Sequence, residues 1–222
     1  MYQGIAERLL DISSKVHKAC RQAQRSEKDV KLVAVSKLQP IDVINKAYAL
    51  GINNFGENYA QELAKKSSVC PEDIIWHFIG PIQSNKVSII AKHANWVHSI
   101  DREKIAREFS KHQNILKDKK FFVQINTGKE KTKSGIFPED TKDFLFFLKN
   151  EINLSIHGLM CIPPINEDPK PHFAKLRFLA SENKIDQLIR DANNQIQEHI
   201  SSNAISVAID LIEKQLDKQQ KE

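Results

Sequence analysis

The sequence is poor in features that mark several large classes of protein. Its three cysteines, Cys20, Cys70 and Cys161, are odd in number, and their spacing matches no metal-binding motif. We therefore expect free thiols in a reducing compartment and no metal site. No apolar run approaches the roughly 18 residues typical of a membrane-spanning helix, and the N-terminus lacks the apolar core of a signal peptide. These absences predict a cytoplasmic protein that does not contact membranes.

Glycine is scarce and basic residues form no block. The 222 residues include 7 glycines, and no strand candidate is followed by the G-x-G-x-x-G turn of a dinucleotide-binding fold. The formal net charge is +5, but the lysines are scattered along the chain among acidic residues. A solvated, lysine-rich surface is the favoured interpretation, so we expect no nucleic-acid partner. The fractions of hydrophobic (41%) and charged (27%) residues are those of an ordinary globular protein.

The sequence does contain a regular alternation of strand and helix patterns. The strand candidates are short apolar runs at residues 30–37, 52–56, 74–79, 95–100, 121–126 and 154–162. The helix candidates are amphipathic segments at residues 2–24, 40–50, 59–66, 84–93, 101–115, 138–149 and 172–183. This alternation predicts an α/β fold with a parallel sheet, either open and doubly wound or closed into a barrel. The missing dinucleotide turn favours a TIM-type β/α barrel, here incomplete, with six recognisable strands.

The first strand candidate ends in a lysine. A period of two places Val33, Val35 and Lys37 on one face of this segment. Chemistry in β/α barrels takes place at the C-terminal ends of the strands. A partly desolvated amine at that end can lose its proton near neutral pH and attack an aldehyde. The alternative is a lysine that simply leaves the strand for solvent.

Several strand ends carry unusual segments. They read A-V-S-K at 34–37, F-G-E-N-Y at 55–59, W-H-F-I-G-P-I-Q-S-N-K at 76–86 and H-G-L-M-C-I-P at 157–163. Together with K-S-G-I at 133–136, they resemble the pyridoxal phosphate homeostasis protein family, whose barrel is related to that of alanine racemase. The resemblance runs from about residue 5 to about residue 188. The third segment alone is long enough to make a chance similarity improbable.

The resemblance implies a cofactor and a set of residues that hold it. Members of this family bind pyridoxal 5′-phosphate (PLP) in a single-domain barrel, as an imine on a lysine that corresponds to Lys37. They act in intracellular vitamin B6 homeostasis and have no established catalytic reaction. By the family pattern, Asn58, His77 and Met160 also line the cofactor. Each also has an explanation that needs no cofactor. Asn58 would be a turn residue, His77 a hydrogen-bonded core histidine, and Met160 a side chain that only packs in the core. Glu57 either holds a neighbouring side chain or is solvated.

The sequence departs from the family pattern after residue 188. The family's seventh and eighth strands, which cradle the phosphate, have no counterpart, and residues 189–222 carry an amphipathic helical pattern without glycine or proline. We therefore predict a truncated barrel domain over residues 1–188 and a helical tail over residues 189–222. Three interpretations of the tail are open. It is a natural replacement that leaves a weakened paralogue, or its helices cap the open barrel, alone or in a dimer. Otherwise the chain is a sequencing product that folds poorly.

Three functions are open to such a chain. The first, which we favour, is a PLP-binding homeostasis protein without catalytic activity. The second is a PLP-dependent, racemase-like enzyme, which would need a second base from another strand or domain. The third is a non-binding or weakened paralogue that acts through its helical tail. The expected ligand is PLP, PLP-requiring apo-enzymes are hypothetical recipients, and the chain is expected to be a monomer or a weak homodimer.

Overall fold

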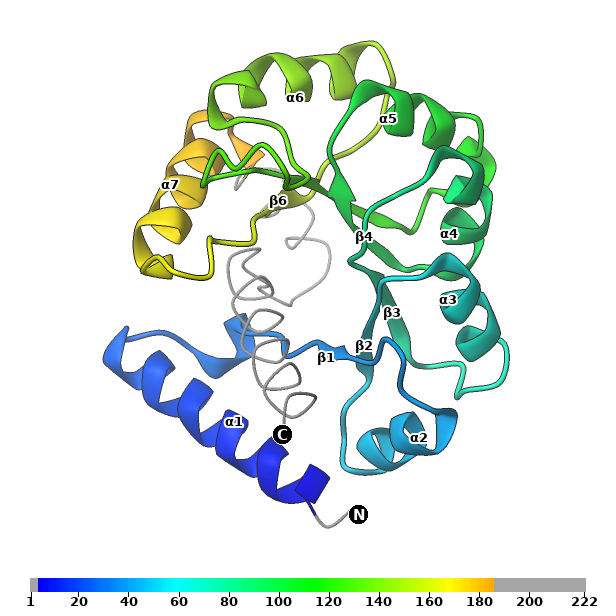
Figure 1. Ribbon diagram of the computed structural model, residues 1–222, viewed down its shortest axis with the longest axis vertical. Helices are drawn as coiled ribbons and strands as arrows, with labels where there is room; N and C mark the ends of the chain where they lie inside the picture. Colours follow the sequence, from blue (N-terminus) through cyan, green and yellow to red (C-terminus); the bar gives the residue numbers. More distant parts are fainter. Residues whose placement is uncertain (1–3, 186–222) are drawn as a thin grey trace.

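The computed structural model describes residues 4–185 (Figure 1). The predicted boundary at residue 188 and the predicted tail over residues 189–222 lie outside the described residues, so both stay predictions. In the part that is described, no helix is long and apolar enough to cross a membrane. Within residues 4–185 the three cysteines form no disulfide bond, as their number and spacing indicate, and all three are buried.

The molecule is built around a parallel sheet. Its six strands are β1 (Ala34–Val35), β2 (Asn54–Glu57), β3 (Ile75–Phe78), β4 (Trp96–Ile100), β5 (Lys120–Gln124) and β6 (Gly158–Met160). They pair in sequence order, and every pair is parallel. Parallel neighbours need a crossover connection, which the intervening helical segments provide. The predicted α/β fold with a parallel sheet is therefore confirmed.

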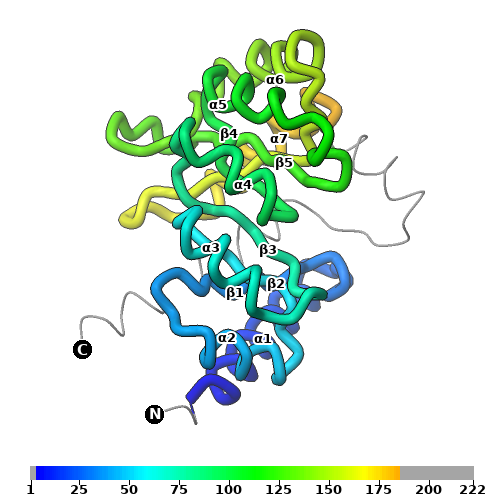
Figure 2. The backbone as a smooth tube through the Cα atoms, turned by 90° about the vertical axis from the view of Figure 1, so that its right-hand side faces the viewer, coloured from blue at the N-terminus to red at the C-terminus, as the bar shows by residue number. Residues whose placement is uncertain are grey.

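The helices lie around the outside of the sheet. They are α1 (Gly4–Gln22), α2 (Ile41–Ala49), α3 (Ala60–Ser67), α4 (Val87–His93), α5 (Glu103–Ser110), α6 (Thr141–Asn150) and α7 (Pro169–Glu182). Short 3₁₀ turns are η1 (Glu27–Asp29), η2 (Ser84–Lys86), η3 (Gln113–Ile115) and η4 (Pro138–Asp140). In Figure 1 the strands form an inner arc and α2 to α6 follow one another around it. Figure 2 shows the same succession from the side, from α1 and α2 at the bottom to α6 at the top.

Two apolar clusters fill the two faces of the sheet. The larger one joins the outer strand residues, such as Phe55, to helix residues such as Leu63 and Ile90. The smaller one consists of Val33, Val35, Ile79, Phe122 and Met160, with Trp96 packed against it. Val35 lies in β1 and Met160 in β6, the first and last strands of the sheet. Because opposite ends of the sheet share one cluster, the sheet curls around it as a barrel requires.

The first strand is shorter than predicted. β1 spans Ala34–Val35 rather than residues 30–37, and its ladder ends where the Ser36 N–H donates to the Gly56 carbonyl oxygen at 2.9 Å. Leu38 then adopts a left-handed backbone with φ of 61°, and the Gln39 N–H donates back to the Ser36 carbonyl oxygen at 3.0 Å. A left-handed residue cannot continue a strand. The prediction that Lys37 is the last strand residue is therefore wrong, and Lys37 lies in the turn just beyond β1.

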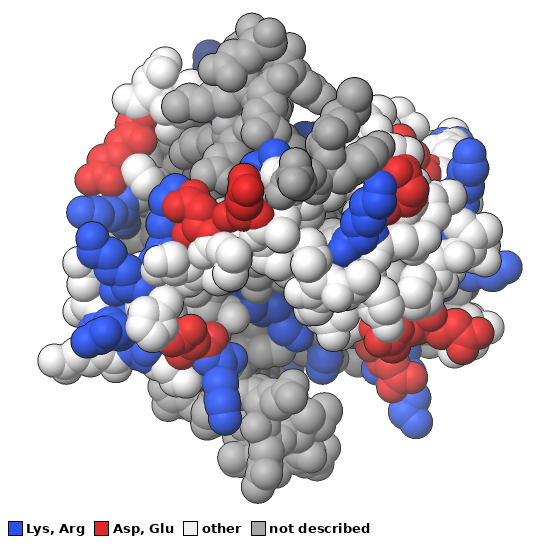
Figure 3. Space-filling view, turned by 90° about the horizontal axis from the view of Figure 1, so that it is seen from below, with Lys and Arg blue, Asp and Glu red and all other residues white. Residues whose placement is uncertain are grey.

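Charged side chains are mixed on the visible surface. In Figure 3, basic and acidic side chains lie interspersed over the face seen from below. Many form short-range ion pairs along the helices, as Lys15 does with Asp11 and Lys111 with Glu108. This pattern is that of a solvated surface.

Candidate functional site

Lys37 and Asn58 follow the neighbouring strands β1 and β2 at the C-terminal edge of the sheet. The strand register pairs Val35 with Gly56. Lys37 and Asn58 each follow these paired residues by two positions, so both leave the sheet at the same edge. Both side chains are half-buried. The structure thus places two of the predicted site residues at one edge of the sheet, at the end of the strands where barrels carry out their chemistry.

Asn58 has a polar atom that no described residue satisfies. Its side-chain amide oxygen is buried and has no hydrogen-bond partner among residues 4–185. The backbone around it is tightly enclosed, because a Cβ atom on Gly80 would lie 2.3 Å from the Asn58 carbonyl oxygen. Buried polar groups in folded proteins are almost always satisfied, so this amide is suited to a bound ligand or water molecule.

Met160 lies inside the curled sheet. Its side chain is buried, and it belongs to the same apolar cluster as Val33 and Val35, which precede Lys37. Gly158, two positions earlier on β6, leaves space on the same face of this strand. Met160 therefore lies on the inner face of the sheet, and its contact with a cofactor stays a prediction.

His77 is fully enclosed, and both of its ring nitrogens have protein partners. Nδ1 lies 2.9 Å from Nε2 of His98, and Nε2 lies 3.0 Å from Oδ1 of Asn54. The ring also stacks on Trp96, with ring centroids 5.3 Å apart. These contacts match a hydrogen-bonded core histidine, the structural alternative weighed for this residue. They leave neither nitrogen to a ligand, and a role of His77 at the cofactor stays a prediction.

The neighbours of His77 determine its tautomer. The Asn54 Nδ2 amide donates to Oδ1 of Asn53 at 2.7 Å, so Asn54 Oδ1 is the acceptor that faces His77. His77 must then carry its proton on Nε2, and its Nδ1 accepts from the Nε2–H of His98. The chain of bonds ends at His98 Nδ1, a buried acceptor without a partner among the described residues.

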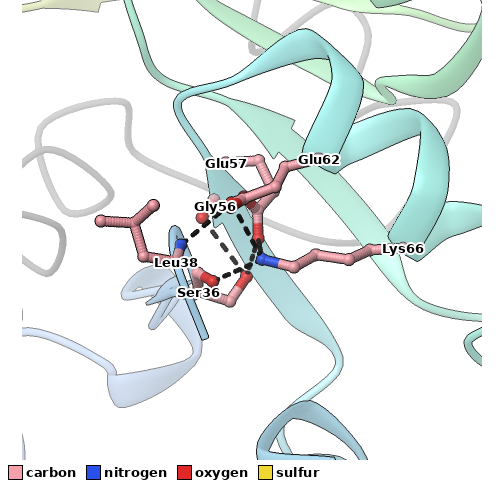
Figure 4. A network of polar contacts seen from close by, with 6 residues as sticks. All are labelled: Ser36, Leu38, Gly56, Glu57, Glu62 and Lys66. Carbon is pink, nitrogen blue, oxygen red and sulfur yellow. Dashed lines mark hydrogen bonds and ion pairs between the residues drawn. The ribbon is translucent and has the colours of Figure 1, made fainter. Parts of the chain in front are cut away.

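A buried ionic network joins Ser36 and Leu38, the two chain neighbours of Lys37, to side chains of β2 and α3 (Figure 4). The Lys66 ammonium of α3 donates to the Ser36 carbonyl oxygen at 2.7 Å, to Glu57 Oε1 at 2.8 Å and to Glu62 Oε2 at 3.1 Å. The Ser36 hydroxyl donates to the same Glu57 oxygen at 2.6 Å. The Leu38 N–H donates to Glu62 Oε2 at 2.9 Å. Glu57 therefore holds neighbouring side chains, as one of its two predicted alternatives required.

Burial controls the electrostatics of this network. It raises the pKa of Glu57 to about 7, against the opposing effects of the Lys66 and Ser36 hydrogen bonds. Burial would also raise the pKa of Glu62, but hydrogen bonds from the Leu38 N–H and Lys66 outweigh it, and the net shift is downward. The Lys66 ammonium thus donates to two carboxylates whose pKa values are shifted in opposite directions. Glu57 takes up a proton before Glu62 as the pH falls.

Comparison with known proteins identifies the family. Residues 11–216 match the family model "Alanine racemase, N-terminal domain". The chain is 42% identical over 180 residues to the pyridoxal phosphate homeostasis protein of Pseudomonas aeruginosa, covering 79% of this chain and 78% of that protein. It is 38% identical over 183 residues to the protein of that name from Aquifex aeolicus, covering 79% of each. The chain belongs to the pyridoxal phosphate homeostasis protein family.

The motifs at the strand ends therefore pointed to the correct family and barrel type. A solved structure of a pyridoxal phosphate homeostasis family relative, PipY of Synechococcus elongatus with PLP bound, is 30% identical, has a TM-score of 0.65 and covers 88% of this chain and 85% of that one. The curated relatives are named as homeostasis proteins and not as enzymes. The family match continues to residue 216, past the predicted domain boundary.

Sequence reasoning missed part of this family member's network. Ser36, Glu62 and Lys66 were not singled out, although Glu62 and Lys66 have the i,i+4 spacing of a helical ion pair. That spacing is common on exposed helix faces. Only the approach of Glu57 from β2 turns the pair into a buried group, and no signal in a single sequence reports that approach.

Proposed function

We propose that this chain binds PLP, carries it on Lys37, and takes part in vitamin B6 homeostasis without catalysing a reaction. The observation that supports this is the unsatisfied buried amide oxygen of Asn58 at the C-terminal edge of the sheet, the same edge at which Lys37 follows β1. The family membership of the chain adds to it, since one relative has been solved with PLP bound.

The residues at this edge divide the task of holding such a ligand. When bound, PLP supplies an aldehyde that condenses with a neutral amine and releases one water molecule. Lys37 provides the amine. Asn58 offers a buried amide that can bond to a polar substituent of the ring. Met160 presents an apolar, polarizable surface inside the sheet against which a flat ring can pack.

Absorbance and covalent trapping test the proposal. The purified chain is titrated with PLP, reduced with borohydride and digested, and the peptides are mapped by mass spectrometry. We expect a change in the cofactor's spectrum and a cofactor mass on the peptide that contains Lys37. The Lys37→Ala variant should lose both, and Lys65→Ala, which removes an exposed lysine on α3, should keep them. An unchanged spectrum, or a mass on other lysines only, would overturn the proposal.

The proposal extends to the transfer of PLP to other proteins and to the oligomeric state of the chain. We propose that the chain works in the cytoplasm, as a monomer or weak homodimer, and passes PLP to apo-enzymes that require it. Light scattering of the protein across a range of concentrations measures the assembly. Reactivation of an apo-enzyme by the loaded chain, faster than by released PLP alone, measures delivery. Racemisation of an amino acid above the rate of free PLP would indicate an enzyme instead.

A further inference from the structure

The backbone before Lys37 is fixed from two sides. The Ser36 N–H donates to the Gly56 carbonyl oxygen of β2 at 2.9 Å, which continues the ladder of the sheet. The Ser36 carbonyl oxygen accepts from Lys66 at 2.7 Å, and the Ser36 hydroxyl donates to Glu57 at 2.6 Å. Every polar group of Ser36 is thus bonded, and two of its partners belong to the buried ionic network.

Two contacts hold the backbone after Lys37: the Leu38 N–H donates to Glu62, and the Gln39 N–H donates to the Ser36 carbonyl oxygen at 3.0 Å. Leu38 has a φ of 61°, a conformation that costs a residue with a Cβ atom free energy relative to the right-handed region. Its side chain is 63% exposed, so packing does not enforce this conformation. The Leu38 N–H bond to Glu62 Oε2, at 2.9 Å, is the side-chain contact that helps to compensate for it.

The two anchors share one turn of α3. Glu62 and Lys66 are four residues apart on this helix and are themselves bonded at 3.1 Å. The Lys66 side chain is 5% exposed and that of Glu57 is fully buried, so solvent does not weaken their contacts. A buried ammonium with three acceptors has little freedom to move, because losing any one acceptor leaves a charged donor unsatisfied. One rigid helical turn therefore sets the backbone on both sides of Lys37.

We propose that Glu62 and Lys66 are positioning residues for Lys37, which fix the direction of its amine and thereby set the affinity for the cofactor without touching it. This inference rests on the proposed function of Lys37. Bound ligands are held most tightly by groups that need no rearrangement on binding. The clamp formed by Glu62, Lys66, Glu57 and Ser36 supplies that preorganisation at the amine.

The central test compares Glu62→Ala with Glu62→Gln. Alanine removes the acceptor for the Leu38 N–H, whereas glutamine keeps an acceptor oxygen of the same reach. We expect Glu62→Ala and Lys66→Met to weaken the affinity for PLP about tenfold, as loss of a hydrogen bond to a charged group does. Glu62→Gln should restore most of that affinity. The circular dichroism induced in the bound cofactor reports its orientation and should change in the two weakened variants only.

A matched control separates positioning from stability. Ile90→Val trims a fully buried side chain on α4, on the far side of α3 from the turn, and destabilises the fold without altering the clamp. It should leave the PLP affinity and the induced circular dichroism unchanged. If Ile90→Val weakens binding as much as Glu62→Ala does at equal stability, or if Glu62→Ala binds PLP like the wild type, the proposal is overturned.

Two measurements without cofactor distinguish this inference from the proposed function. In the wild type, the amides of residues 38 and 39 should exchange slowly with solvent, and Glu62→Ala should speed this exchange. Acetic anhydride, used as a probe of amine reactivity, should then label Lys37 at a changed rate relative to Lys65. If the wild type binds no PLP, the proposed function is wrong. The proposed positioning role of Glu62 and Lys66 is wrong if amide exchange and lysine labelling are the same in Glu62→Ala and the wild type.

Discussion

Nδ1 of His77 lies 2.9 Å from Nε2 of His98, and both imidazoles are shut off from solvent inside the curled sheet. Burial lowers the pKa of His98 to about 3. Burial, together with His98 and Lys31, holds the pKa of His77 well below its usual 6.5. Both rings are therefore neutral in the folded protein at pH 7, and the chain of hydrogen bonds to Asn54 depends on that neutrality.

This pair should make the fold sensitive to acid. The unfolded chain takes up protons on these histidines below about pH 6.5, whereas the folded chain resists them, so stability falls as the pH drops from that value toward about 3. We expect His98→Gln, which keeps a donor for His77, to lose part of this dependence. Urea unfolding at about pH 7.5 and about pH 5 measures it. If the variant and the wild type lose the same stability between these two pH values, the acid sensitivity does not come from His98.

Glu57 should act in the opposite direction. Burial raises its pKa in the folded state to about 7, so the folded chain holds a proton that the unfolded chain releases from about pH 4.5 upward. Its contribution to stability is therefore fully present below about pH 4.5 and is lost as the pH rises through about 7.

The Glu57→Gln variant should remove this loss. Glutamine keeps an acceptor for Lys66 and does not titrate, so the variant should gain about 1–3 kcal/mol relative to the wild type between about pH 5 and about pH 8. The histidines and Glu57 change the stability in opposite directions with pH. The contribution of each is therefore measured as the difference in the free energy of unfolding between its variant and the wild type at each pH. A constant difference for Glu57→Gln across this range would show that Glu57 is already ionised near pH 5.

Gly80→Ala should damage both stability and the site. A Cβ atom at this position would lie 2.3 Å from the Asn58 carbonyl oxygen and 2.6 Å from the Asn58 Cα atom, so the backbone of Asn58 must shift. Such overpacking costs about 1–3 kcal/mol, which lowers the melting temperature by several degrees. Since Asn58 lies at the same edge of the sheet as Lys37, we also expect weaker PLP binding.

Gly51→Ala is the control for Gly80→Ala. Gly51 has a φ of 93° and open space around its Cα atom, so alanine strains the backbone there without a clash. Gly51 lies between α2 and β2, at the opposite end of β2 from Asn58. The Gly51→Ala substitution should lower the melting temperature and leave PLP binding unchanged. Equal effects of both substitutions on binding would mean that the site responds to stability alone.

The sequence predicts what depends on periodicity and misses what depends on tertiary contact. The period of two correctly puts Val33 and Val35 on the inner face, since covered strands are specified by alternating side chains. The turn after Ser36 is not predictable, because leucine at position 38 gives no sign of a left-handed backbone. The burial of Lys66 is equally hidden, because it arises when β2 brings Glu57 against α3.

Leu38→Gly tests whether Glu62 holds strained backbone. Glycine adopts a φ of 61° without penalty, which should stabilise the folded turn by about 1 kcal/mol. It also frees the unfolded chain, at a cost of about 0.5–1 kcal/mol, so the net change in the free energy of unfolding should be small. Leu38→Val, with a branched Cβ, should instead destabilise the fold by about 1 kcal/mol.

The decisive measurement is a double-mutant cycle between positions 38 and 62. If the bond from the Leu38 N–H to Glu62 compensates for backbone strain, Glu62→Ala should cost less stability and less PLP affinity in the Leu38→Gly background than in the wild type. The two residues are in direct contact, so a coupling of about 0.5 kcal/mol or more is expected. Strictly additive effects would mean that the turn keeps its shape without Glu62, and that the hydrogen bonds of Ser36 are enough to position Lys37.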